Sequence, residues 1–261
     1  YTLSLHDALP ILVIIIFRIF AFPNLKIMHP DIDSLLTATA SLTETEILAL
    51  LTERYPDKVV FSTSFGMEDQ VITDFIMKGH FPVKIFTLDT GRLFYETYTT
   101  WELTNEYYHT KITPYYPDAK AIEEYVQDNG INAFYQSVPL RHACCHIRKV
   151  EPLKRALQGN KVWITGLRAE QSPHREQMPM VEWDESNQII KVHLLLHWKT
   201  EQVLSFLRSH GIPYNPLHDK GYPSIGCAPC TRAVKEGEDF RAGRWWWEHK
   251  TNKECGLHVH Q

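Results

Sequence analysis

The chain has 261 residues, of which 44% are hydrophobic, and its formal net charge is −4. This length and composition are enough to bury the core of one large domain, or of one domain with an appendage. The net negative charge disfavours nucleic acid as an electrostatically attracted partner.

The N-terminal segment, residues 1–27, differs from the rest of the chain. Its apolar run at 11–22 is shorter than the roughly 20 residues that a helix needs to cross a bilayer, and Arg18 interrupts it. A secretory signal would have a basic region before the run and a small-residue cleavage site after it, and this segment has neither. We therefore expect no membrane partner and treat residues 1–27 as a leader or non-native segment outside the fold.

From residue 28 onward, helical and strand patterns alternate. Thr43 and Glu46 have the spacing of a capping box that opens a helix. The alternation predicts an α/β fold, a parallel sheet with helices on both faces and ligands beyond the carboxyl ends of the strands. The expected strands are 58–62, 83–88, 110–113 and 161–165, and the expected helices are 43–54, 69–78, 94–108, 119–127 and 200–210.

Two polar loops follow the first two expected strands. Residues 62–69 (STSFGMED) combine hydroxyl groups, a glycine and a helix start, which suits a phosphate or sulfate group. No Gly-Lys-Ser/Thr sequence follows, so this is not a Walker A loop. Residues 88–92 (LDTGR) come after the next strand. Because the carboxyl ends of neighbouring parallel strands share one edge, the two loops are expected to form one pocket.

Basic residues follow strand ends or cysteines in several places. Arg148 and Lys149 follow a cysteine pair, Arg168 follows a strand, and Arg241 and Arg244 precede three tryptophans. This placement favours a cluster of cations around an anionic ligand.

Four of the five cysteines are expected to form one metal site. The vicinal pair Cys144 and Cys145 and the spaced pair Cys227 and Cys230 suit tetrahedral zinc or an iron–sulfur cluster. The vicinal pair favours the cluster, because a cluster offers each thiolate its own iron. The fifth cysteine, Cys255, is a candidate nucleophile. The odd number and the absence of a signal sequence indicate a reducing cytoplasm rather than secretory disulfides.

Seven motifs occur together in a fixed order, and they closely resemble those of the assimilatory adenylyl-sulfate (APS) reductases. The resemblance extends over roughly residues 42–258. The motifs are 62–69 (STSFGMED), 88–93 (LDTGRL), 144–153 (CCHIRKVEPL), 163–168 (WITGLR), 215–219 (NPLHD), 221–232 (GYPSIGCAPCTR) and 254–258 (ECGLH).

The resemblance implies an adenine-nucleotide-binding fold of the PP-loop type and the reduction of adenylyl sulfate to sulfite and AMP. Residues 28–240 would form the reductase domain with the cluster site, and residues 241–261 a flexible catalytic tail. A [4Fe–4S] cluster would be bound by Cys144, Cys145, Cys227 and Cys230. Cys255 would form an S-sulfonate that thioredoxin, or a glutaredoxin-like protein, then reduces.

The implied catalytic residues besides Cys255 are Lys149, which would lie between cluster and substrate, and His258. The residues expected to bind substrate are Ser62, Ser64, Gly66, Asp69, Leu88, Asp89, Thr90, Gly91, Arg92, Arg168, Arg241 and Arg244. Two positions depart from the family pattern: Tyr95 replaces a usual proline, and Ala169 replaces a common second arginine.

Three alternatives remain. A 3′-phosphoadenylyl-sulfate (PAPS) reductase, or an enzyme that accepts both nucleotides, would share the fold and the C-terminal cysteine, but PAPS reductases typically lack the two cysteine pairs. A PP-loop tRNA-thiolation enzyme would need a Ser-Gly-Gly-x-Asp-Ser loop and a basic surface. A non-enzymatic zinc module is the most distant alternative.

Overall fold

The computed structural model describes residues 30–248, and these build one six-stranded sheet of order β3-β2-β1-β4-β6-β5. Neighbouring strands pair in parallel from β3 to β6, and β5 pairs with β6 in the antiparallel sense. The strands are β1 (Val59–Thr63), β2 (Lys84–Leu88), β3 (Thr113–Tyr115), β4 (Val162–Thr165), β5 (Val181–Asp184) and β6 (Ile189–His193).

The antiparallel edge strand corrects the expectation of a parallel sheet. Only residues 185–188 separate β5 from β6, and a link this short can form a hairpin but not the crossover that a parallel pair needs. Asp184 closes this turn, since its carboxylate accepts a hydrogen bond from the backbone N–H of Asn187 at 3.0 Å.

The described part of the chain has helices at all five expected places. The capping box holds, because the Thr43 hydroxyl accepts from the Glu46 N–H and the Glu46 carboxylate accepts from the Thr43 N–H. Three helices and two strands were not expected from the sequence: α1, α6, α7, β5 and β6. The helices are α1 (Pro30–Thr39), α2 (Glu44–Arg54), α3 (Met67–Lys78), α4 (Tyr95–Tyr107), α5 (Ala119–Asn129), α6 (Val138–Cys145), α7 (Glu151–Leu157) and α8 (Thr200–Ser209).

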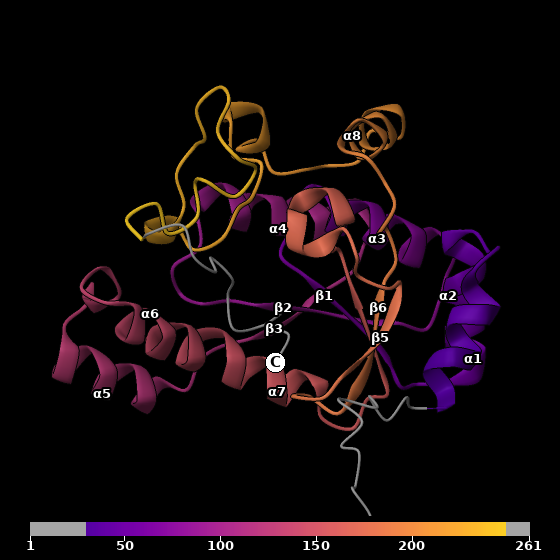
Figure 1. Ribbon diagram of the computed structural model, residues 1–261, viewed down its shortest axis with the longest axis horizontal. Coiled ribbons are helices and arrows are strands. Elements are labelled where there is room, and N and C mark those ends of the chain that lie inside the picture. Colours follow the sequence, from indigo (N-terminus) through magenta and orange to yellow (C-terminus); the bar gives the residue numbers. More distant parts are fainter. Residues whose placement is uncertain (1–29, 249–261) are drawn as a thin grey trace, which may run out of the picture.

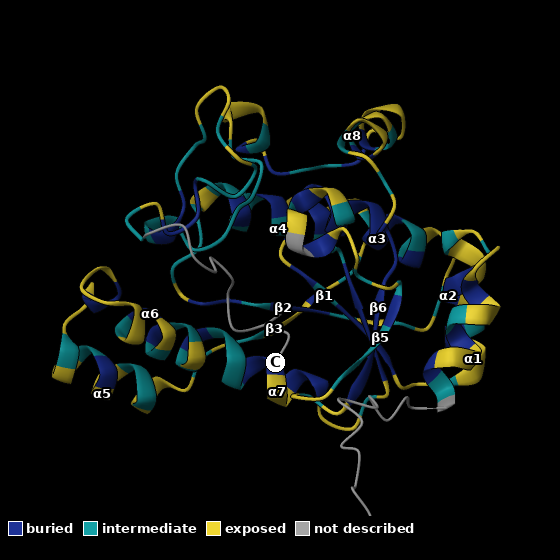
Figure 2. Cartoon of the chain, viewed as in Figure 1, coloured by how far each residue is buried: buried dark blue, intermediate teal, exposed yellow. Residues whose placement is uncertain are grey.

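Helices cover both faces of the sheet, as expected (Figure 1). Side chains of β1 alternate between two hydrophobic cores. Val59 and Phe61 pack with residues of α1, α2, α3 and α8, whereas Val60 packs with residues of α7 on the opposite face. Figure 2 shows the resulting dark core between the layers. None of the helices in residues 30–248 is long and apolar enough to span a membrane.

Helices α5 and α6 form a pair beside the β3 edge of the sheet, and α6 ends with the first cysteine pair (Figure 1). The Tyr125 hydroxyl on α5 donates to the Leu140 carbonyl on α6 at 3.0 Å and ties the two together. A π-helical turn, His146–Val150, then joins α6 to α7. Turns of this kind are frequent at functional sites.

Leu48→Ala should destabilise the protein by about 2 to 5 kcal/mol, because Leu48 on α2 is fully buried in the larger core and its truncation leaves a cavity. Leu103→Ala on α4 is the matched control: Leu103 is 46% exposed, and we expect a change within about 0.5 kcal/mol. Urea unfolding curves of the two variants measure the difference. Equal effects would contradict the assignment of α2 to the core.

Candidate active site

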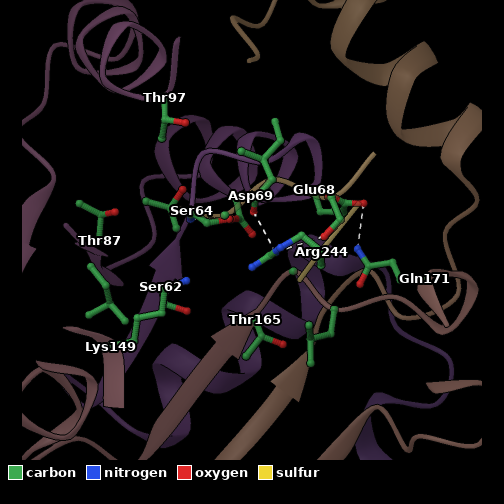
Figure 3. Close-up of a pocket in the computed structure, with 18 of the residues that line it drawn as sticks. Ser62, Ser64, Glu68, Asp69, Thr87, Thr97, Lys149, Thr165, Gln171 and Arg244 are labelled. Atoms are coloured by element: carbon green, nitrogen blue, oxygen red, sulfur yellow. Dashed lines mark hydrogen bonds between the residues drawn. The ribbon is translucent and has the colours of Figure 1, made fainter. Parts of the chain in front are cut away.

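A cavity of about 220 Å³ lies at the carboxyl ends of the parallel strands (Figure 3). It brings together residues from the β1–α3 loop, from the ends of β2 and β4, from the start of α7 and from the C-terminal region. Eight of the sequence-predicted site residues line it: Ser62, Ser64, Gly66, Asp69, Leu88, Lys149, Arg241 and Arg244.

The β1–α3 loop is shaped around Asp69. Its carboxylate accepts hydrogen bonds from the Ser64 N–H at 2.6 Å and from the Ser64 hydroxyl at 2.7 Å. Phe65 has a left-handed backbone, with φ at 59°, and its buried ring stacks on Trp101. The apolar Phe65 side chain therefore anchors the turn. The two hydrogen-bond donors of Ser64 are taken up by the Asp69 carboxylate.

Asp69 is an unusual acid for a site expected to bind an anion. Burial raises the pKa of its carboxyl to about 7, against the opposing effect of the hydrogen bonds from Ser64. With a pKa of about 7, the carboxyl is partly protonated at neutral pH, so it holds the loop with less negative charge in the cavity than an ordinary aspartate would carry.

Gly226 and Arg244 show why a glycine is needed on the opposite wall. A Cβ atom at Gly226 would lie 2.3 Å from the Arg244 guanidinium. Arg244 is buried, lies over the Trp245 ring at 4.7 Å and reaches the Ser224 hydroxyl at 3.4 Å. The glycine therefore lets this cation reach the cavity.

In the loop after β2, Leu93 lines this cavity, whereas residues 89–92 do not. Asp89 accepts hydrogen bonds from the Gly91 N–H and the Tyr98 hydroxyl, both at 2.8 Å. Thr90 places its hydroxyl 3.3 Å from the Cys227 sulfur. Arg92 donates to the 131–132 segment and lies over the Phe134 ring. The sequence placed both loops in one pocket, whereas Thr90 and Arg92 of the second loop lie on the cysteine side.

Arg168 is also outside the cavity lining. It is fully buried, and its guanidinium donates to the Glu68 carboxylate at 2.8 Å and the Glu170 carboxylate at 2.7 Å. The Trp198 carbonyl and the Thr200 hydroxyl accept further hydrogen bonds from the same guanidinium. Glu68 lines the cavity, so Arg168 reaches the site through this partner rather than directly.

The four cysteines of the described chain line a second, smaller cavity. Cys144 and Cys145 come from the end of α6, whereas Cys227 precedes and Cys230 ends a short 3₁₀ turn. None of these four cysteines forms a disulfide within residues 30–248. The other residues that line this cavity are Arg92, Phe134, Arg141, Arg148, Lys149 and Pro229.

Lys149 lines both cavities. The π-helical turn that follows the first cysteine pair carries it and Arg148 side by side. Arg148 donates to the Thr90 carbonyl at 2.6 Å on the cysteine side, while Lys149 reaches the shared wall. The sequence identified both cations. It did not predict the π-helical turn, from which Arg148 reaches the cysteine side and Lys149 reaches both cavities.

The chemistry around the cysteines suits a sulfur-bound anionic centre. Burial raises the pKa of the Cys144 thiol, and that of Cys230 to about 12, so ionised thiolates here need a bound cation. Arg141 and Arg148 each have a buried nitrogen, Nη1 and Nε, without a hydrogen-bond partner among residues 30–248. These donors suit a cluster whose core and thiolates together are anionic. In the same part of the chain, no three histidine, cysteine or carboxylate side chains surround one point that could hold a single metal ion.

Several cavity residues were not identified from the sequence. One of them is Trp163 on β4, whose indole N–H donates to the Ser62 hydroxyl at 2.8 Å. Thr165 contacts the buried His193 at 2.7 Å, and His193 in turn contacts Glu182 at 3.2 Å. Trp163 and Thr165 lie in the strand expected at 161–165, and this position was the signal by which the sequence could have identified them. The remaining polar residues in the lining that were not predicted are Thr63, Glu68, Thr87, Thr97, Gln171, Arg175, His218 and Ser224.

Two predicted catalytic residues, Cys255 and His258, lie outside the described residues.

Asp69→Asn should change how stability depends on pH. The carboxyl ionises near pH 3.8 in the unfolded chain and near pH 7 in the folded one. As pH rises between these values, the unfolded state loses this proton first, so the wild type loses stability that the neutral asparagine variant keeps. Between pH 5 and pH 8 the variant should gain about 2 to 3 kcal/mol relative to the wild type.

Urea unfolding of both proteins at the two pH values measures this gain, and other titrating groups cancel because both chains contain them. A constant difference between the proteins would show that Asp69 ionises at its ordinary pKa.

Comparisons with known proteins agree with this geometry. The family model "Phosphoadenosine phosphosulfate reductase domain" matches residues 58–233. Proteins named adenosine 5′-phosphosulfate reductase are 52% identical in Allochromatium vinosum, over 86% of this chain and 89% of that protein, and 48% identical in Burkholderia cepacia, over 82% and 85%.

Solved structures show the same fold. The phosphoadenylyl-sulfate reductase of Candida auris, in a phosphate complex, is similar with a TM-score of 0.68 and 29% identity, over 79% of this chain and 98% of that chain. The FMN adenylyltransferase of Candida glabrata, at 16% identity and a TM-score of 0.52 over 85% and 78%, shares the fold alone. The matched domain covers more than half of the sequence, and the chain belongs to the phosphoadenosine phosphosulfate reductase family.

Proposed function

We propose that this protein reduces adenylyl sulfate to sulfite and AMP in assimilatory sulfate reduction. The observation that carries the proposal is the shared wall at Lys149, where a polar cavity at the strand ends meets a cavity lined by four cysteines. The name of the bacterial relatives, adenosine 5′-phosphosulfate reductase, supports the same substrate.

The large cavity binds the nucleotide and its sulfate. Lys149, Arg241 and Arg244 line it and supply the cations that a sulfate group ringed by oxygens needs before a thiolate can approach. Asp69, with its raised pKa, holds the β1–α3 loop without full negative charge. Arg168 acts behind the cavity by holding Glu68 and Glu170.

Cys255 is the nucleophile of the proposed reaction. Its thiolate attacks the sulfate sulfur, an S–S bond forms, and the bond from that sulfur to the bridging oxygen breaks, so AMP leaves with the electron pair. A thiol of thioredoxin, or of a glutaredoxin-like protein, then attacks the Cys255 sulfur and displaces sulfite with two electrons. The second thiol of the reductant closes a disulfide and releases Cys255. His258, three residues after Cys255, is the other catalytic residue proposed for this segment.

Cys144, Cys145, Cys227 and Cys230 would hold a [4Fe–4S] cluster. When bound, the cluster supplies a fixed charge beside Lys149 and a link between the two cysteine segments. No change of its redox state is required, because the electrons come from thiols. A reaction that depends on reduced thiols supports a location in the cytoplasm.

A PAPS reductase, or an enzyme that accepts both nucleotides, is the second candidate. The likeness to the Candida auris phosphoadenylyl-sulfate reductase supports it, and the two cysteine pairs around one cavity favour adenylyl sulfate. Steady-state rates with each nucleotide separate the two. A kcat/KM for PAPS that exceeds the value for adenylyl sulfate would overturn the proposed substrate. A tRNA-thiolation role is disfavoured by the net charge of −4.

Protein purified without oxygen should contain about four iron atoms and four sulfides per chain, because four cysteines from two segments line one cavity. Iron and acid-labile sulfide analysis, with the brown absorption of a cluster, measures this. Cys227→Ser should lose the cluster. One zinc ion per chain without sulfide would contradict the proposed cofactor.

Cys255→Ser should retain the cluster and bind AMP, but neither form an S-sulfonate nor release sulfite, because the nucleophile is lost while both cavities remain. Wild-type protein incubated with adenylyl sulfate and no reductant should gain the mass of one SO₃ group on the peptide that contains Cys255. Mass spectrometry locates the addition. Addition on Cys144 or Cys145, or turnover by the serine variant, would contradict this assignment.

A further inference from the structure

The segment that leads into the C-terminal tail, residues 243–248, is held by both cysteine segments; we call it the tail root. On one side its backbone pairs with the second cysteine segment. The Gly243 carbonyl accepts from the Arg232 N–H at 3.0 Å, and the Trp245 N–H donates to the Cys230 carbonyl at 3.2 Å. The start of the tail root is thus aligned with the chain that leaves Cys230.

On the other side, an ion pair ties the tail root to the first cysteine segment. Arg141 on α6 donates from Nε to one Glu248 carboxylate oxygen at 2.5 Å and from Nη2 to the other at 3.0 Å. The two side chains are 1% and 8% exposed. The guanidinium also lies over the Trp245 ring, 4.6 Å from its centroid. A planar, bidentate and buried contact of this kind fixes both position and orientation.

Arg141 also faces the cysteines. It precedes Cys144 and Cys145 by three and four residues on the same helix, the spacing that puts side chains on one face. It lines the cavity between the four cysteines, and its buried Nη1 has no hydrogen-bond partner among residues 30–248. One guanidinium therefore contacts the tail root with two nitrogens and leaves the third for the group that the cysteines hold.

We propose that the Arg141–Glu248 pair is a positioning clasp, which sets the point from which the C-terminal tail delivers Cys255 to the substrate. The inference rests on the proposed function, in which Cys255 is the nucleophile. Cys255 is seven residues beyond Glu248 in the sequence. A chain of that length spans at most about 25 Å, so the position of Glu248 limits where the thiol can be.

The chemistry of the pair supports a role in geometry rather than in stability alone. Hydrophobic residues of similar volume often replace a buried ion pair with no loss of stability. A bidentate pair, in contrast, selects one register between α6 and the tail root. Through Arg141, the helix that carries the first cysteine pair also carries the anchor of the nucleophile.

Glu248→Gln tests the clasp, because it keeps the volume and one acceptor but removes the charge. Arg141→Lys is the second variant, which keeps the charge but loses the planar fork. Arg155→Gln is the matched control: Arg155 makes a similar two-nitrogen pair with Glu151 on α7, but that pair is about 40% exposed and does not contact the tail root.

Hydrogen exchange of amides in residues 243–248 gives a readout that does not depend on activity. We expect at least tenfold faster exchange there in Glu248→Gln, with iron content and the cluster absorption spectrum unchanged, and no change in Arg155→Gln. The rate of S-sulfonate formation on Cys255 in a single turnover should fall at least tenfold in Glu248→Gln, while AMP affinity stays within twofold. In Arg141→Lys, both the exchange rate and the rate of S-sulfonate formation should lie between those of Glu248→Gln and the wild type.

Glu248→Gln with wild-type exchange, or with a wild-type rate of S-sulfonate formation, would overturn the clasp. Loss of the cluster or of AMP binding in that variant would also overturn it, since the pair would then be structural. Wild-type protein that gains no SO₃ group on Cys255 would instead refute the proposed function, so the two failures are distinguishable.

Discussion

The arrangement of this protein depends on buried arginines, since a guanidinium removed from water must be paired or must face an anion. Arg141, Arg148, Arg168 and Arg244 are each at most 8% exposed. Arg168 is saturated by carboxylates, a carbonyl and a hydroxyl, so it organises the protein behind the substrate cavity. The other three lie beside a cavity, and each has a buried nitrogen without a partner among residues 30–248. Pairing thus divides the arginines into those that complete the scaffold and those that face a site.

The strand ends of the core could be predicted from sequence, because local signals there agree with the tertiary structure. The apolar run before Ser62 is the buried β1, and the polar loop after it begins α3 at the cavity. The β5–β6 hairpin was missed, because the β5 segment at 181–184 (VEWD) reads as irregular polar sequence. Its pattern becomes clear only in the pair, where Ile190 on β6 lies opposite Trp183. Helix α6 was missed because its core-facing residues include an arginine and a cysteine, which carry little helical pattern.

The site residues divide along the same line. Ser62, Ser64, Asp69 and Lys149 follow local signals and lie where the sequence placed them, around the larger cavity. Arg168 was expected to bind substrate, and its buried partners could not be foreseen, because they lie on segments distant in sequence: Glu68 is 100 residues away and Thr200 is 32 residues away. A basic residue after a strand has the same sequence signature whether it binds a ligand or a buried carboxylate, and only the tertiary contacts distinguish the two.

The two cavities are adjacent, since one residue lines both of them. Lys149 belongs to both linings. Arg148 beside it donates to the Thr90 carbonyl, and the hydroxyl of Thr90 contacts the Cys227 sulfur. Charges at partly buried positions interact more strongly than they do in bulk water. The proposed cluster and the sulfate of the proposed substrate are both anionic, and their repulsion would weaken substrate binding if nothing lay between them. In the proposed function, a lysine on the shared wall would attract both groups at once, so the π-helical turn that places Lys149 there would link binding in one cavity to the contents of the other.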